Sequence, residues 1–259
     1  MTTGPPDFVG IGVPKCGTSW WFSLLTAHPE IYVANSKELL YFNQNFLNHL
    51  NADGLTQAEL DTYQDWFPRP EGRITGEWTP NYVFRYQLPP LLRRAAPGAK
   101  LLVMLRDPIE RYQSDVSRHM NRRQLQNTRF KSVNNGYYSA ILAPWEQAYG
   151  PSELLVLQFE ACLADPGAML DRTFEFLGVA PGFRPANMRV PVNKTRAKRD
   201  VDRDIETLLS RAYERDVVEL VARHPQIDLA LWPNFAPILG RPPAVADSDE
   251  AAPVPDPGT

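Results

Sequence analysis

A lysine and two hydroxyl residues stand together near the N-terminus, where an apolar segment ends. The stretch FVGIGVPKCGTSWWFSLL, residues 8–25, places Lys15, Thr18 and Ser19 around Gly17, between an expected strand and an expected helix. The first turn of a helix exposes backbone N–H groups and the positive end of the helix dipole, and both attract anions. The junction therefore predicts a binding site for a phosphorylated molecule. The alternative is that these residues only cap the helix.

Alternating strand and helix patterns place this junction in an α/β domain. Apolar runs predict strands at 8–13, 31–33, 100–105 and 153–160, and apolar periodicity predicts helices at 18–27, 164–178 and 201–223. Thr56 and Glu59 have the spacing of a capping box, which predicts a helix that begins there. We therefore expect a three-layer α/β fold, in which helices flank a mostly parallel sheet around a P-loop-like nucleotide-binding core.

The expected sheet brings two turns together. Ligands of such sheets bind beyond the carboxyl ends of the strands, so the turn after Val13 and the turn after Leu105 should be neighbours. Arg106 and Asp107 follow Leu105 directly, and Pro108 after them is typical of a helix start. This edge of the sheet is the expected place of the site.

The length of the chain indicates the number of domains, and the distribution of charge indicates which partners to expect. The chain has 259 residues and 43% hydrophobic residues, enough for one domain, which we place at residues 1–239. Residues 240–259 are rich in Pro, Ala and Asp, and we expect a disordered tail there. The tail carries the whole net charge of −3, so the domain is near neutral. Basic clusters at 118–123 and 193–199 fit a compact polyanion better than a nucleic acid, and we expect no nucleic-acid partner.

The sequence predicts neither a membrane protein nor a metal-binding protein. No apolar run is long enough to cross a bilayer, and the first residues, MTTGPPDF, do not form a signal peptide, so we predict a cytoplasmic protein without a membrane partner. Two cysteines, Cys16 and Cys162, form neither a disulfide framework nor a metal cluster. The sequence says nothing of the oligomeric state.

The phosphate loop departs from the nucleotide-triphosphate pattern and resembles another family. An ATP- or GTP-binding loop ends in Gly-Lys-Ser/Thr, whereas Lys15 here precedes Gly17 by two residues. The stretch PKCGTSWW resembles the 5′-phosphosulfate loop of sulfotransferases that use 3′-phosphoadenosine 5′-phosphosulfate (PAPS). The stretch LRDPIERYQSDVSRH, residues 105–119, resembles their 3′-phosphate segment.

Three further stretches follow in the family's order. They are SKELLYFN at 36–43, GEWTPNY at 76–82 and a long segment at 134–166. The resemblance covers most of residues 7–199 and is closest to the branch that includes heparan-sulfate-type carbohydrate sulfotransferases. It implies sulfuryl transfer from PAPS to a hydroxyl or amine of a carbohydrate or small molecule, with adenosine 3′,5′-bisphosphate as the second product and no metal.

The resemblance also implies a donor site. Lys15 would bind the 5′-phosphosulfate and stabilise charge on the leaving oxygen. Arg106 and Ser114 would hold the 3′-phosphate, Arg106 with the planar fork of its guanidinium. The basic stretch at 193–199 would cover the donor, or would be a solvated loop. The residues expected to bind the donor are Lys15, Cys16, Gly17, Thr18, Ser19, Trp20, Arg106, Ser114, Lys194, Arg196, Lys198 and Arg199.

On the acceptor side the resemblance implies a general base. Glu38 matches the glutamate that takes the acceptor's proton in relatives, and His119 is a second candidate. Lys37, Glu77 and Trp78 are expected to contact the acceptor. Relatives usually have a lysine in place of Trp78, and an indole there favours a flat, less charged acceptor over an acidic one.

Several alternatives remain open. Arg106 could form a structural ion pair with Asp107 or Glu110, Glu38 could be a solvated loop acid, and Trp20, Trp21 and Trp145 could be core residues. A nucleotide kinase could use the same loop with Asp107 on magnesium, although the Gly-Lys-Ser/Thr ending is missing. A PAPS-binding protein without catalysis would keep the donor residues but would not need Glu38.

Overall fold

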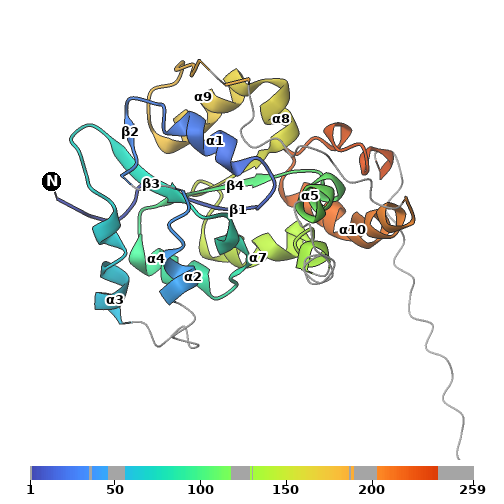
Figure 1. Cartoon of the computed structure of the whole chain (residues 1–259), viewed down its shortest axis with the longest axis horizontal. Coiled ribbons are helices and arrows are strands. Elements are labelled where there is room, and N and C mark those ends of the chain that lie inside the picture. The colour runs from blue at the N-terminus through green and yellow to red at the C-terminus, as the bar shows by residue number, and fades with distance from the viewer. Residues whose placement is uncertain are drawn as a thin grey trace, which may run out of the picture.

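A parallel sheet forms the centre of the molecule. The computed structural model describes residues 2–34, 37–45, 56–117, 129, 131–186, 188–189 and 203–238. Its strands are β1 (Phe8–Gly12), β2 (Ile31–Tyr32), β3 (Ile74–Trp78), β4 (Lys100–Leu105) and β5 (Leu154–Gln158). They pair in the order β2-β3-β1-β4-β5, and every pairing is parallel (Figure 1). The predicted α/β class is confirmed.

Helices cover both faces of this sheet. Helices α1 (Thr18–Leu25), α8 (Phe159–Ala164) and α9 (Pro166–Leu177) lie on one face, and α4 (Leu88–Ala95) and α7 (Tyr138–Ala148) lie on the other (Figure 1). A hydrogen bond from the Trp21 indole to the Thr173 hydroxyl, 3.3 Å, ties α1 to α9. The three-layer architecture that the alternating pattern predicts is therefore present.

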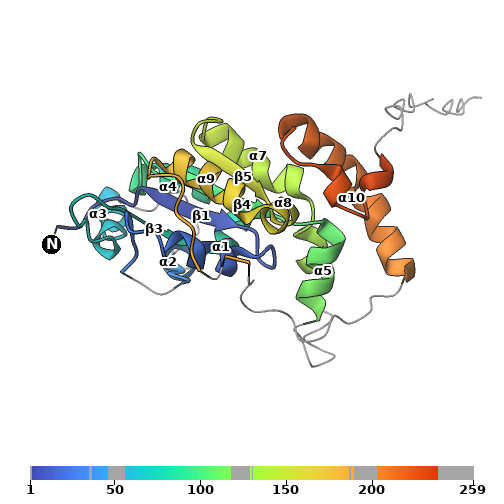
Figure 2. The same cartoon turned by 90° about the horizontal axis from the view of Figure 1, so that it is seen from above.

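The remaining helices lie around these layers. Helix α5 (Pro108–Val116) follows β4 and packs beside the long C-terminal helix α10 (Arg203–Arg223), as Figure 2 shows. The short helices are α2 (Tyr41–Asn45), α3 (Gln57–Asp61) and the 3₁₀ turns η3 (Gln64–Trp66), η4 (Pro80–Phe84), η5 (Leu229–Leu231) and η6 (Ala236–Ile238). No helix of the described residues is long and apolar enough to cross a membrane.

Local sequence signals account for several helix boundaries. The capping box at α3 is formed, because the Thr56 hydroxyl accepts from the Glu59 N–H and the Glu59 carboxylate accepts from the Thr56 N–H. Asp107 caps α5, and Pro108 occupies its first turn. Gly178 ends α9 in the left-handed conformation, at φ 82°.

Tryptophans fill the core on both faces of the sheet. Trp20, Trp21, Trp78 and Trp145 are all buried, so the interpretation of Trp20, Trp21 and Trp145 as core residues is confirmed. Trp78 requires a glycine beneath it, since a Cβ on Gly10 would lie 2.1 Å from the indole ring. The resulting packing carries large apolar surface into the centre of the fold.

Candidate active site

The loop between β1 and α1 forms an open helix N-terminus. Gly17 precedes the helix in the left-handed conformation, at φ 86°, and no described side chain caps this end. A Cβ at Gly17 would lie 2.4 Å from the Phe159 ring, so conformation and space both require glycine. The first N–H groups of α1 are therefore available to an anion, as the sequence predicts.

Buried contacts join this loop to the segment after β4. The Val13 N–H donates to the Met104 carbonyl over 3.0 Å, so the two turns are neighbours, as predicted. Cys16 Sγ lies 3.8 Å from the Tyr138 hydroxyl, which donates to the Arg106 carbonyl over 2.9 Å. Burial raises the pKa of the Cys16 thiol to about 12. Cys16 thus anchors the loop, and only its backbone could reach a donor.

Lys15 lies in this loop and points toward helix α5. Its Nζ is 3.9 Å from Asp115 Oδ1, and Asp115 Oδ2 is 3.7 Å from Nη1 of the buried Arg111. Lys15 itself has a positive φ of 73°. The ammonium therefore lies between the phosphate loop and α5, where a phosphosulfate bound at the helix N-terminus would meet it.

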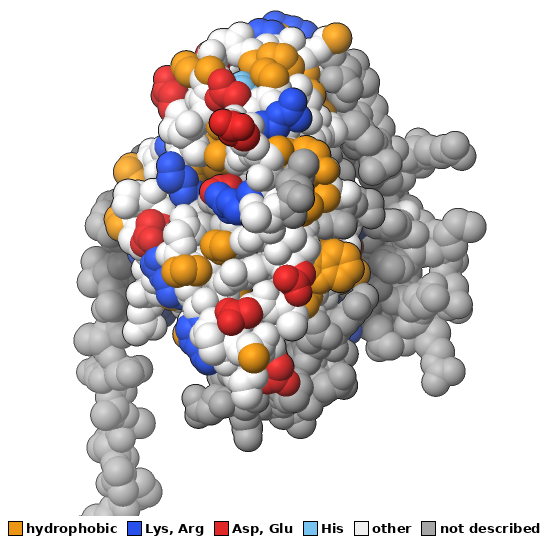
Figure 3. All heavy atoms as spheres, turned by 90° about the vertical axis from the view of Figure 1, so that its left-hand side faces the viewer, with side chains coloured by type: hydrophobic (Ala, Val, Ile, Leu, Met, Phe, Trp, Pro, Cys, Tyr) orange, Lys and Arg blue, Asp and Glu red, His pale blue; other side chains and the backbone are white. Residues whose placement is uncertain are grey.

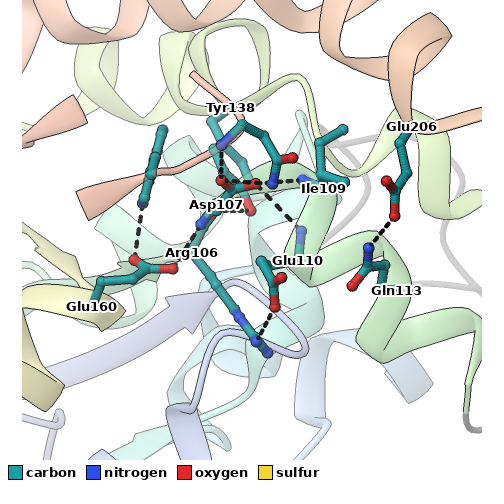
Figure 4. A network of polar contacts seen from close by, with 10 residues as sticks. Arg106, Asp107, Ile109, Glu110, Gln113, Tyr138, Glu160 and Glu206 are labelled. Carbon is teal, nitrogen blue, oxygen red and sulfur yellow. Dashed lines mark hydrogen bonds and ion pairs between the residues drawn. The ribbon is translucent and has the colours of Figure 1, made fainter. Parts of the chain in front are cut away.

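Arg106 forms the ion pair that the sequence left as an alternative. Its Nη2 lies 2.9 Å from Glu110 Oε2 (Figure 4). The guanidinium also lies over the Phe159 ring, 5.2 Å from its centre. The Nε atom is buried without a hydrogen-bond partner in the described part of the chain. Ser114 follows on the same helix and is nearly buried. The pair does not exclude phosphate binding, because a partly exposed salt bridge contributes little and can exchange partners.

The carboxylate of Asp107 is held by hydrogen bonds to other groups of the protein. It accepts from the N–H groups of Ile109 and Glu110, at 2.9 and 3.3 Å, and from the Asn234 backbone and side-chain amide, at 3.2 and 3.0 Å (Figure 4). Burial raises the pKa of Asp107, and these hydrogen bonds oppose that rise. No oxygen of this buried group faces solvent, which argues against the magnesium role that a kinase would give it.

Glu160 belongs to the same network, and the sequence did not single it out. Its carboxylate accepts from the Asp107 N–H at 3.0 Å and from the Trp232 indole at 2.9 Å. Residues near the C-terminal end of the described chain thus hold the segment that carries Arg106 (Figure 4). The capping signal Asp-Pro is visible in the sequence, but the partners from 232–234 are not.

Lys37 lies on the phosphate loop. Its Nζ donates to Thr18 Oγ1 over 2.8 Å and to Ser19 Oγ over 3.2 Å, and it lies 5.8 Å from the centre of the Trp78 ring. Burial lowers the pKa of Lys37 to about 8, although the negative charge of Glu38 opposes the shift. The sequence predicted an acceptor contact for this residue, whereas the structure brings it to the first turn of α1.

Glu38 stands beside Lys37 at the rim of a hollow. The hollow has a volume of about 450 Å³ and is lined by Ser19, Phe22, Ser23, Thr26, Val33, Lys37 and Glu38. Glu38 is exposed, so its carboxylate is accessible to a molecule bound there. The hollow joins the predicted base to the phosphate loop through Ser19.

Glu77 does not face this hollow, which corrects the acceptor role predicted for it. The side chain is 5% exposed and accepts from the Tyr63 hydroxyl at 2.7 Å and the Thr79 hydroxyl at 2.6 Å. Burial raises the pKa of Glu77 to about 7, and the hydrogen bonds oppose that rise. The Thr79 oxygen in turn accepts from the Leu40 N–H at 3.2 Å. Glu77 is therefore a buried support of the segment that carries Lys37 and Glu38.

Two tryptophans in the predicted site are also core residues. Trp78 is 0% exposed, and its indole donates to the Gly12 carbonyl over 3.3 Å. It cannot offer the stacking surface that the sequence predicted. The Trp20 ring is packed edge-on against Trp21 and Phe159, so only the backbone of Trp20 could bind a donor. The inference of a flat acceptor from Trp78 therefore loses its basis.

Other predicted residues lie outside the described residues. They are His119, Lys194, Arg196, Lys198 and Arg199, together with the tail at 240–259. Among the residues that are described, no group of three or more His, Cys, Asp or Glu side chains could hold a metal ion.

Comparisons with known proteins agree with this geometry. A family model for the "Sulfotransferase family" matches residues 57–183, which include Arg106 and Ser114. Heparan sulfate glucosamine 3-O-sulfotransferase 3A1 of Mus musculus is 27% identical over 191 residues, which are 67% of this chain and 46% of that protein. Over these residues the chain is similar to proteins of the sulfotransferase family. The resemblance that the motifs carry is thereby confirmed.

Further relatives show how far the likeness extends. Human bifunctional heparan sulfate N-deacetylase/N-sulfotransferase 3 is 26% identical over 209 residues, which are 69% of this chain and 23% of that protein. The chain thus spans half or less of the length of these curated relatives. The crystal structure of a sulfotransferase from Alicyclobacillus acidocaldarius has a TM-score of 0.68 at 24% identity and covers 88% of this chain and 98% of its own. The fold is therefore that of sulfotransferases.

Proposed function

We propose that this protein transfers the sulfuryl group of PAPS to a hydroxyl or amine of a carbohydrate or small-molecule acceptor. The observation that carries the proposal is the meeting of two cationic segments at one edge of the sheet. Lys15 follows β1 and Arg106 follows β4, and the Tyr138 hydroxyl between them contacts both segments. An elongated donor with anionic groups at both ends fits this arrangement, since each segment would hold one end.

The phosphate loop would bind the sulfuryl end of the donor. The uncapped N-terminus of α1 offers backbone N–H groups, and Thr18 and Ser19 add hydroxyls. Lys15 would neutralise charge on the bridging oxygen as it leaves. At the other end, Arg106 would exchange Glu110 for the 3′-phosphate, and Ser114 would add a hydroxyl donor.

Glu38 is proposed as the general base. The acceptor oxygen attacks sulfur, the bond between sulfur and the bridging oxygen breaks, and its electron pair leaves with adenosine 3′,5′-bisphosphate. The acceptor's proton passes to the Glu38 carboxylate, which is exposed at the rim of the hollow. His119 stays a second candidate for this role. Positioning and charge neutralisation, as in phosphoryl transfer, would account for most of the rate.

The acceptor would lie in the hollow beside α1. Its described lining combines apolar walls, Phe22 and Val33, with the hydroxyls of Ser19, Ser23 and Thr26. The named relatives act on heparan sulfate, and a carbohydrate acceptor agrees with such a lining. On the face seen in Figure 3, which includes the region of α3, acidic and basic side chains are interspersed rather than gathered by sign. The cytoplasmic location expected from the sequence stays a prediction.

The test is nucleotide binding followed by turnover. PAPS and adenosine 3′,5′-bisphosphate should raise the melting temperature, whereas ATP with magnesium should not. Lys15→Ala should lower turnover by roughly a hundredfold to a thousandfold, since it removes a charge at the leaving oxygen. Stabilisation by ATP and magnesium alone would favour the kinase hypothesis. Binding of PAPS without transfer to any sugar, phenol or amine would favour a non-catalytic binding protein.

A further inference from the structure

Lys37 reaches the phosphate loop from a different part of the fold than Lys15 does. It follows β2, the edge strand, whereas the loop follows β1, and β3 lies between these two strands. Its ammonium nevertheless contacts the hydroxyls of Thr18 and Ser19, at 2.8 and 3.2 Å. Lys15 extends toward Asp115 on α5 instead. Two cations therefore approach the first turn of α1 from separate elements.

The surroundings of Lys37 are those of an anion site rather than of a structural ion pair. None of the described carboxylates lies within salt-bridge distance of Nζ, which donates to the two neutral hydroxyls of Thr18 and Ser19. A half-buried ammonium without a paired carboxylate is costly, and burial lowers its pKa to about 8. An anion at the open helix N-terminus would supply the missing charge.

The ring of Trp78 is the third neighbour of the Lys37 ammonium, after Thr18 and Ser19. Its buried indole fills the space above Gly10 and packs edge-on against Phe22, at 6.5 Å between ring centres. It can offer a ring face to a cation but no charge of its own, and Lys37 Nζ lies 5.8 Å from that ring. The Trp78 position is thus apolar and buried, and the ammonium of Lys37 lies beside it.

We propose that Lys37 is a second donor-binding cation, which contacts the 5′-phosphosulfate end of the donor together with Lys15. The proposal rests on the proposed function, because it assigns one more residue to the same donor site. Thr18 and Ser19 accept hydrogen bonds from Lys37, so their own O–H groups can donate to the bound anion.

The position also predicts how donor affinity depends on pH. Among the described residues, the groups that face Nζ are Thr18 and Ser19 on α1, Trp78 on β3 and Glu38 on its own segment, and of these Glu38 is the ionisable one. A bound anion favours the charged form of Lys37, so nucleotide binding takes up a proton above pH 8. Affinity should therefore be constant below pH 7 and fall as the pH rises through 8.

Calorimetry with adenosine 3′,5′-bisphosphate between pH 7 and 9.5 tests the proposal on the parent, Lys37→Arg, Lys37→Met and Lys100→Met. Lys100, at the amino end of β4, is a control, because it is a partly buried lysine at the opposite edge of the sheet. The parent and Lys100→Met should lose about fivefold in affinity between pH 8 and pH 9. Lys37→Arg should show no such loss, because arginine stays charged. Lys37→Met should bind at least tenfold more weakly at pH 7 and show no pH dependence.

A chemical measurement checks the same contact without turnover. Acetylation of the Lys37 amine at pH 8, followed by mass spectrometry, should be suppressed by bound adenosine 3′,5′-bisphosphate. Equal acetylation with and without nucleotide, or parent-like affinity of Lys37→Met, would overturn the proposal and leave the proposed function standing. Failure of the parent to bind the nucleotide at all would instead refute the proposed function and this inference together.

Discussion

The backbone N–H of Leu40 donates to the Thr79 hydroxyl across 3.2 Å. The Thr79 hydroxyl donates its hydrogen bond to Glu77 over 2.6 Å, so its oxygen is available as an acceptor. Leu40 lies two residues after Glu38, and it has a positive φ of 56°. A buried carboxylate thus orients a hydroxyl that holds the segment carrying Lys37 and Glu38. Both proposed functional side chains depend on this support.

We predict that Thr79→Val lowers turnover about tenfold or more while nucleotide affinity changes little. Valine keeps the volume of threonine but cannot accept from the Leu40 N–H, so Glu38 would lose its position. Thr79→Ser keeps the hydroxyl and should restore most of the rate. Steady-state kinetics and calorimetry on both variants make the measurement.

Hydrogen exchange separates this positioning role from a general loss of stability. In Thr79→Val the amide of Leu40 should exchange faster than in the parent, while amides of β4 keep their protection. If valine and serine at position 79 reduced turnover equally, the hydroxyl would have no special part in the support.

Glu77 should make the protein less stable as the pH rises toward neutrality. Its pKa is raised by burial to about 7 from 4.5, so between these values the folded state binds more protons than the unfolded state. The free energy of unfolding should therefore fall from pH 4.5 to pH 7, by about 3 kcal/mol from this group. Glu77→Gln cannot titrate and should lack this component. The measurement is the difference between parent and variant in urea unfolding at pH 4.5, 5.5 and 7, and a constant difference would contradict the prediction.

Much of the fold could be predicted from local patterns. The continuous apolar runs at 100–105 and 153–160 predicted β4 and β5, because buried parallel strands need no alternation of polar residues. The glycine turn at 14–17 predicted the open N-terminus of α1, since its signals lie within a few residues of one another. The Thr56–Glu59 capping box predicted the start of α3 for the same reason.

What the sequence could not show depends on contacts between distant segments. Nothing near Lys37 indicates that its ammonium reaches Thr18 and Ser19, which are nearly twenty residues away. Comparison with the family motif predicted that Trp78 contacts the acceptor. Its burial depends instead on the space above Gly10, which the motif does not show. Asn234 contacts Asp107 from a segment without any recognisable motif. These side chains were placed by packing, not by local propensity.

Arg106 should decide which nucleotide is bound. If its guanidinium holds a 3′-phosphate, the parent should prefer adenosine 3′,5′-bisphosphate to adenosine 5′-monophosphate, and Arg106→Ala should erase most of that preference. Arg184→Ala is a matched control, because Arg184 also pairs with a carboxylate, that of Asp171, and is not among the proposed site residues. Calorimetry with both nucleotides makes the comparison. Equal affinity of the parent for the two nucleotides would refute the role.

Glu38 should be needed for chemistry but not for donor binding. Glu38→Gln keeps the shape of the side chain but cannot take a proton at neutral pH, so turnover should fall by roughly a hundredfold or more. Affinity for adenosine 3′,5′-bisphosphate should stay within a few-fold of the parent, because the carboxylate lies at the rim of the hollow.

The pH profile of turnover completes the test of Glu38. The parent's rate should fall in acid as the carboxylate is protonated, and the residual rate of Glu38→Gln should lack that acidic limb. Burial raises the pKa of Glu77 to about 7, so this carboxyl is protonated in acid and the profile of Glu77→Gln is the necessary comparison. If the acidic limb persists in Glu38→Gln and disappears in Glu77→Gln, protonation of the buried Glu77 causes the loss of rate in acid. Near-parental turnover of Glu38→Gln would make His119 the next candidate for the base.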